Sequence, residues 1–151
     1  MAACTFFGHR DCPDGFRPLL RKAILDLIAN HDVDMFYVGH QSRFDAVVRG
    51  VLHELVHECV GIRYAVALAH MLSERSGPFD LSDTMLPDGI EFVHPHYAIS
   101  WRNKWMLQQS DFVVAYVSHS WGGATQYVQK AIRSGKTVIN LYDLQQGGDS
   151  R

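Results

Sequence analysis

The sequence predicts an α/β protein: a single Rossmann-like domain with a mostly parallel sheet and helices on both faces. The length of 151 residues suits one domain with a full core. Nearly continuous apolar runs of strand length alternate with amphipathic segments, which is typical of a parallel sheet buried on both faces. We expect the domain to span residues 1–144 and residues 145–151 to form a flexible C-terminal tail.

Apolar spacing defines the elements of the first half. An apolar run at 3–7 is typical of a buried strand, and Gly8 ends it. Pro13-Asp14-Gly15 then starts a helix whose apolar residues recur every three or four positions as far as Ile28. The rest of this half is predicted as a strand, a polar loop, a helix and a strand, at 33–38, 39–43, 44–60 and 62–69.

The second half begins with a less periodic stretch. Residues 70–89 contain Gly77-Pro78, Pro87 and Gly89, which predict an irregular connection or a lid. After this stretch we expect a short strand, a helix, a buried strand, a helix and a last strand, at 92–93, 97–109, 112–117, 125–133 and 137–141.

The composition favours a cytoplasmic protein with a small-molecule partner. Cys4, Cys12 and Cys59 show no paired spacing, and no basic region precedes the first apolar residues. The net charge of −2 gives no positive field for nucleic acid or an anionic membrane. No apolar run approaches membrane-spanning length.

Three polar loops follow strands of the predicted sheet, at 8–11, 39–43 and 118–125. In a parallel sheet such loops converge at the carboxyl ends of the strands, where ligands bind. The third loop contains Gly122-Gly123 at the start of a predicted helix, where backbone N–H groups can approach a phosphate closely. A simple strand-to-helix turn also needs glycine, so both interpretations stay open.

Three residues in or next to these loops each have a functional and a structural interpretation. Asp45 either contacts a ribose hydroxyl or caps its helix, and Arg10 either clamps a phosphate or forms a surface ion pair. Trp121 either stacks on a base or packs against the protein.

The segment His53-Glu54-Leu55-Val56-His57 matches the zinc hydrolase pattern H-E-x-x-H. Helical phase argues against it, because both histidines project away from the apolar stripe of their helix. The downstream extension is also missing, since Val60 and Arg63 occupy its glycine and histidine positions. A zinc hydrolase is therefore a minor alternative, and we predict no metal site, because His9 with Cys12 and His94 with His96 offer too few ligands.

Four groups of residues, in order along the chain, resemble the YpsA-like branch of the SLOG superfamily. They are Thr5-Phe6-Phe7-Gly8-His9-Arg10, Tyr37-Val38-Gly39 with Gln41 and Phe44-Asp45, Ser100 with Arg102-Asn103-Lys104-Trp105-Met106, and Ser118-His119-Ser120-Trp121-Gly122-Gly123-Ala124. The resemblance implies a Rossmann-like fold and a nucleotide or ADP-ribose-like ligand. The superfamily includes the LOG enzymes, which split the N-glycosidic bond of cytokinin nucleotides.

Comparison with the LOG enzymes residue by residue favours binding over hydrolysis. Arg102 and Met106 are similar to a LOG arginine and methionine, but Val128 or Gln129 stands where LOG enzymes carry a glutamate. Neither supplies the carboxylate that helps an oxocarbenium-like transition state. Ser42 also stands where relatives tend to carry glycine. The alternative is a phosphoribohydrolase-type N-glycosidase that uses a carboxylate from another loop, with Asp11, Asp45 and Asp83 as the candidates.

The sequence thus predicts a nucleotide-binding or sensing protein, with Arg102 and Asp45 as the candidates should a reaction be catalysed. No cofactor is assigned beyond such a ligand. Self-association is left open, because the aromatic residues of 97–109 suit either an interface or the core. The expected ligand-binding residues are Gly8, His9, Arg10, Gly39, Gln41, Asp45, Arg102, Ser118, Ser120, Trp121, Gly122, Gly123, Ala124 and Thr125.

Overall fold

A computed structural model describes residues 2–70 and 83–147. Its sheet has six strands in the order β4-β3-β2-β1-β5-β6, and every neighbouring pair is parallel. The strands are β1 (Ala2–Gly8), β2 (Val33–Val38), β3 (Arg63–Ala67), β4 (Thr84–Met85), β5 (Phe112–Tyr116) and β6 (Thr137–Asn140). This sheet confirms the predicted fold class.

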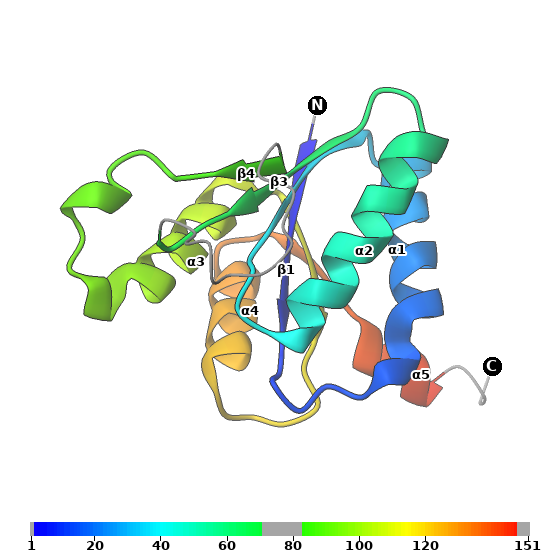
Figure 1. The fold of residues 1–151 in the computed structure, drawn as a ribbon. Coiled ribbons are helices and arrows are strands. Elements are labelled where there is room, and N and C mark those ends of the chain that lie inside the picture. The colour runs from blue at the N-terminus through cyan, green and yellow to red at the C-terminus, as the bar shows by residue number, and fades with distance from the viewer. Residues whose placement is uncertain (1, 71–82, 148–151) are drawn as a thin grey trace.

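Helices cover both faces of the sheet (Figure 1). They are α1 (Arg17–Asn30), α2 (Arg43–Glu58), α3 (Ala98–Gln109), α4 (Gly123–Arg133) and α5 (Leu141–Gly147). The described residues also include the short 3-10 turns η1 (Asp14–Phe16), before α1, and η4 (Ile90–Phe92) and η5 (Pro95–Tyr97), before α3. Among the described residues, we find no helix with the length and apolar character needed to cross a membrane.

The strand β1 shows why the core has two halves. Successive side chains of a strand point to opposite faces, so Phe6 joins the apolar cluster beneath α1, α2 and α5, while Phe7 joins the cluster beneath α3 and α4. Phe6 and Phe7 are both buried. Because β1 lies at the centre and is buried on both faces, its sequence is continuously apolar rather than alternating.

The chain order of the strands sets the place of the ligand crevice. From β1 the chain moves outward through β2, β3 and β4, then returns to pair β5 with the opposite side of β1. The strand order therefore reverses between β1 and β5. In open parallel sheets the crevice outside the carboxyl ends of the strands at this reversal is the usual binding position.

Two strands differ from the sequence-based expectation. Residues 92–93 form no strand: Gly89, at φ 92°, leads into the turn η4, and Phe92 is 87% exposed. A strand of a doubly covered sheet buries its apolar side chains, which Phe92 does not. The short edge strand β4 lies instead at Thr84–Met85, inside the stretch expected to be irregular; residues 71–82 of that stretch lie outside the described residues.

The C-terminal segment also differs in detail. The last strand ends at Asn140, and Leu141, expected in that strand, begins α5 and is fully buried. The Tyr116 hydroxyl donates a hydrogen bond to Gln145 Oε1 at 2.8 Å. The expected boundary between domain and tail thus falls within α5, and residues 148–151 lie outside the described residues.

The aromatic residues of α3 have mixed positions. Trp105 packs against the cluster beneath α3 and α4, and Trp101 packs against a small separate cluster around Ile90. Tyr97 and Ile99 are exposed. Packing of this fold thus accounts for the two tryptophans, while self-association stays a prediction.

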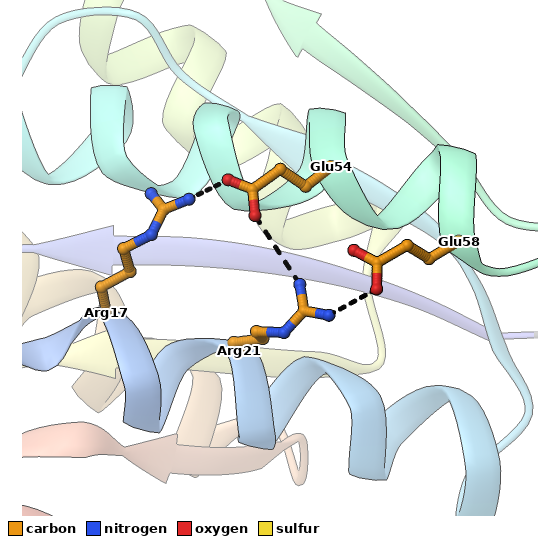
Figure 2. A network of polar contacts seen from close by, with 4 residues as sticks. All are labelled: Arg17, Arg21, Glu54 and Glu58. Carbon is orange, nitrogen blue, oxygen red and sulfur yellow. Dashed lines mark hydrogen bonds and ion pairs between the residues drawn. The ribbon is translucent and has the colours of Figure 1, made fainter.

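A surface network of four charged residues joins α1 to α2 (Figure 2). Arg17 pairs with Glu54, and Arg21 contacts Glu54 at 3.8 Å and Glu58 at 2.6 Å. All four side chains are largely exposed to solvent, so each pair adds little to the free energy of unfolding. The packing of α1 against α2 rests mainly on the apolar residues of the two helices that share one buried cluster.

Gly8 provides a test of packing where β1 meets the crevice. A Cβ at this position would lie 2.4–2.6 Å from ring atoms of Phe44, which is buried and has no room to move. We expect Gly8→Ala to lower the free energy of unfolding in urea by about 1–3 kcal/mol. Gly50→Ala is the matched control: its Cβ meets only Arg17 Nη1 at 3.5 Å inside α2, so a gain of roughly 0.5–1 kcal/mol is expected. Equal effects of the two substitutions would contradict this packing argument.

Candidate functional site

A cavity of about 550 Å³ opens at the carboxyl ends of β1 and β5. Its walls come from the loop after β1, the loop after β2, the helix α3 and the loop between β5 and α4. This volume lies within the range of roughly 300–1,000 Å³ typical of small-molecule sites. The cavity thus occupies the position that the reversal of strand order indicates.

Most of the predicted ligand-binding residues line this cavity. They are Gly8, His9, Arg10, Gln41, Asp45, Arg102, Trp121, Gly122, Gly123 and Ala124. The predicted residues outside its lining are Gly39, Ser118, Ser120 and Thr125. Asp11, one of the three candidate carboxylates, also lines the cavity, whereas Asp83 lies elsewhere and accepts a hydrogen bond from the Tyr64 hydroxyl at 2.6 Å.

Arg102 supplies a buried positive charge at the cavity wall. The residue is only 1% exposed, and its Nη1 donates to the carbonyl oxygen of Ala67 at 2.8 Å. Its Nε donates to Asn103 Oδ1 at 2.8 Å. Burial lowers the pKa of this guanidinium, which the charge of Asp45 partly offsets. Among the described residues, these two bonds use Nε and Nη1 alone, which leaves Nη2 to donate to a bound ligand.

Asp45 stands near Arg102 at the start of α2. Its Oδ2 accepts a hydrogen bond from the Gln41 backbone N–H at 3.1 Å. Burial raises the pKa of this carboxyl group, although the Gln41 hydrogen bond and the charges of Arg102 and Arg49 oppose the shift. The capping role belongs to Ser42, whose Oγ accepts from the Asp45 backbone N–H at 3.1 Å. Serine at position 42 therefore has a physical explanation as the N-cap of α2.

Gly39 lies outside the cavity lining but against two side chains that line it, Asp45 and Arg102. A Cβ here would lie 2.8 Å from Asp45 Oδ2 and 3.0 Å from Arg102 Nη1. The absence of a side chain lets the carboxylate and the guanidinium pack against the end of β2. Glycine at this position is thus explained by close approach of charged side chains rather than by contact with the cavity.

The start of α4 presents backbone donors on another wall of the cavity. Its N-cap residue is Gly122, at φ 99°, and no side chain caps the helix among the described residues. Gly123 and Ala124 line the cavity within the first turn, where backbone N–H groups lack intrahelical acceptors. The Thr125 hydroxyl lies 2.9 Å from the His119 carbonyl oxygen and 3.0 Å from the Trp121 carbonyl oxygen. It therefore serves as a hydrogen-bond donor within the loop before α4.

Three rings form a stack at the mouth of the cavity. The His9 and His119 rings lie 3.4 Å apart at 7°, and the His119 and Trp121 rings 3.7 Å apart at 20°. Trp121 is 67% exposed, whereas His9 is buried and accepts at Nε2 from the His119 backbone N–H at 3.3 Å. Burial and the nearby His119 lower the pKa of His9, while Asp11 acts in the opposite direction.

Sequence reasoning missed His119 as a site residue. Its Nδ1 lies 3.0 Å from the Trp121 carbonyl oxygen, and its Nε2 lies 3.6 Å from Asp11 Oδ1. Within the described part of the chain, His9, Asp11 and His119 are the group of three side chains whose donor atoms lie within 4.8 Å of one another. No short-range spacing signals this group, because its members come from two loops that follow β1 and β5.

The other sequence motifs lie away from the cavity. His53 and His57 are exposed, as helical phase predicts, and Glu54 is paired with Arg17 and Arg21. The His53 and His57 rings meet edge to face at 85°, and neither belongs to a group of three metal-ligating side chains among the described residues. Val128 and Gln129, the alternatives for the LOG glutamate position, are not part of the cavity lining; Tyr127 is.

Comparison with known proteins bears on the fold. No protein-family model matches the chain, and no curated protein sequence matches it. The X-ray structure of DNA processing protein A (DprA) from Streptococcus pneumoniae is similar, with a TM-score of 0.56 and 11% sequence identity. The similarity covers 97% of this chain and 61% of that chain, so this chain spans less than two thirds of its neighbour. This likeness shows a Rossmann-like α/β fold.

His40 gives a pH-dependent test of the positive charge around Arg102. Burial, together with the charges of Arg102 and Arg49, lowers the pKa of His40 to about 4. Between pH 6.5 and about 4 the unfolded chain therefore binds more protons at this residue, and the free energy of unfolding falls as the pH drops. We expect His40→Gln to reduce this loss by on the order of 1 kcal/mol, measured by urea unfolding at several pH values. Parallel pH profiles for the two proteins would contradict the assignment.

Proposed function

We propose that this protein binds a nucleotide or a nucleotide derivative such as ADP-ribose, as a binding or sensing protein of the YpsA-like type. The observation that carries the proposal is the pairing of two anion-attracting groups on one cavity. Arg102 offers a buried guanidinium with an available Nη2, and the uncapped first turn of α4 offers backbone N–H groups. Each of the two groups suits a phosphate group.

The remaining lining residues suit the other parts of a nucleotide. Asp45 is an acceptor of fixed orientation, because Gln41 holds one of its oxygens, and it suits a ribose hydroxyl. One face of Trp121 rests on His119, and the exposed side of the indole suits a planar base. Arg10 at the mouth adds a further positive charge for a second phosphate.

Gly123→Ala tests the phosphate position without disturbing the fold. A Cβ at Gly123 meets nothing within 4 Å in the protein, so the free energy of unfolding should stay the same or rise slightly. The same methyl group lies where the ligand must approach the first turn of α4. We expect calorimetric titration with AMP and ADP-ribose to show binding by the wild type and at least about tenfold weaker binding by the variant, a loss of roughly 1.4 kcal/mol.

Gly50→Ala serves as the control for that titration, because Gly50 lies in α2 and outside the cavity lining. Its affinity for both compounds should equal that of the wild type. Equal affinity of the Gly123→Ala variant would remove the first turn of α4 from the phosphate site. Absence of binding by the wild type to any nucleotide tested would overturn the proposal itself.

Hydrolysis of the N-glycosidic bond is the second candidate function. Asp45 favours it, since a buried carboxyl group with a raised pKa beside Arg102 is a reasonable acid or base. The missing LOG glutamate opposes it, so we expect no base release when the protein is incubated with nucleoside monophosphates or ADP-ribose. Chromatography of the products measures this. Base release that Arg102→Ala abolishes, with the fold of the variant checked by circular dichroism, would replace the binding function with the enzymatic one.

A further inference from the structure

Asp11 and His119 face each other at the rim of the proposed nucleotide cavity, across a gap of 3.6 Å between Asp11 Oδ1 and His119 Nε2. His119 Nδ1 lies 3.0 Å from the Trp121 carbonyl oxygen. A carbonyl oxygen only accepts, so Nδ1 carries a proton and donates it. In the neutral imidazole, Nε2 then presents a lone pair toward an anionic carboxylate. A cation between the two acceptors would attract both lone pairs.

The separation of the two ligand atoms suits a metal ion between them better than a direct hydrogen bond. A charged N–H donor draws a carboxylate oxygen to about 2.7–2.9 Å. Two ligands that each lie roughly 2.1 Å from one ion, at a tetrahedral angle, are about 3.4 Å apart. The observed 3.6 Å between Nε2 and Oδ1 is close to the second value.

We propose that Asp11 and His119 form a binding site for a divalent transition-metal ion, Mn²⁺, Co²⁺ or Zn²⁺. A mixed imidazole and carboxylate donor set suits these ions better than Ca²⁺ or Mg²⁺. The Trp121 carbonyl acts as the second partner of the imidazole, which fixes the tautomer that leaves Nε2 available, as in many metal sites.

His9 forms a wall of this site rather than a ligand. The donor atoms of His9, Asp11 and His119 all lie within 4.8 Å of one another, but the two imidazole rings are parallel at 7° and 3.4 Å apart. An ion in the plane of the His119 ring therefore lies out of the plane of the His9 ring. The site thus has two protein ligands, and the other coordination positions are open to water and to a phosphate oxygen.

The phosphate contribution rests on the proposed function. The start of α4 follows Trp121 directly in the sequence and lines the same cavity. A phosphate group held there can share an oxygen with the ion, as substrate phosphates do at metal sites with few protein ligands. Metal binding by the protein alone should therefore be weak, and a bound nucleotide should strengthen it.

The test is titration of the metal-free, full-length protein with Mn²⁺, Zn²⁺ and Co²⁺ by calorimetry, with Co²⁺ also followed by visible absorption. We expect binding of one ion per chain, and at least about threefold tighter binding when AMP or ADP-ribose is present. Asp11→Asn and His119→Gln should each weaken metal binding about tenfold or more. The Asp11 side chain is 75% exposed, so Asp11→Asn should leave the melting temperature unchanged and keeps the test valid if His119→Gln fails to fold.

The matched control is the double variant His53→Gln and His57→Gln, which removes the exposed histidine pair on α2. Its metal binding should equal that of the wild type. Loss of binding in this control, with binding retained in Asp11→Asn, would overturn the site. So would a ¹⁵N spectrum in which His119 is an imidazolium at neutral pH and does not respond to added metal.

Failure of the metal site is distinguishable from failure of the proposed function. Nucleotide binding by a protein that shows no metal binding dependent on Asp11 and His119 would overturn the metal site and leave the nucleotide function standing. Metal binding that depends on Asp11 and His119, without any nucleotide binding, would support the metal site and overturn the proposed function.

Discussion

The burial of the Arg102 guanidinium is the constraint on which the arrangement of the site depends. A charge removed from water is costly unless neighbouring groups compensate for it. The compensation here comes from the carbonyl oxygen of Ala67, the side chain of Asn103 and the carboxylate of Asp45. These contacts tie α3 to the end of β3 and bring α2 close to the same point. Gly39 completes the arrangement by leaving room for both charges.

The two sides of the cavity differ in how firmly they are held. Arg102 and Asp45 are buried and anchored to the ends of β2 and β3. The opposite side consists of the loops after β1 and β5, in which Asp11 and Trp121 are exposed to solvent and Gly122 adopts a backbone conformation that favours glycine. Fixed charges thus face a wall that is more exposed to solvent. A site of this kind holds one part of a ligand firmly and lets the remainder select its position.

The sequence predicted the fold and most of the cavity lining because both follow from local patterns. Apolar runs of strand length located β1 and β5, and the rule that loops converge at the carboxyl ends of parallel strands located the crevice. The edge strand β4 was missed because two residues carry no periodicity. His119 was missed because it is a candidate site residue only through its closeness in space to Asp11. Asp11 lies 108 positions earlier in the sequence. Such pairings depend on the relative positions of strands, which no local pattern encodes. The placement of Gly39 behind the cavity wall likewise required side-chain geometry.

The pairing of β1 with β5 has a consequence for how this protein folds. These two strands flank the crevice. They pair residue by residue, with Cys4 opposite Phe112 and Gly8 opposite Tyr116. Their contact closes a loop of about a hundred residues, and loop closure of this length costs entropy before any contact can compensate for it. The central pairing of the sheet is therefore a slow, non-local event in assembly. The crevice does not exist until these strands have paired. A ligand that binds in it therefore stabilises the fully folded chain and does not stabilise partly folded states.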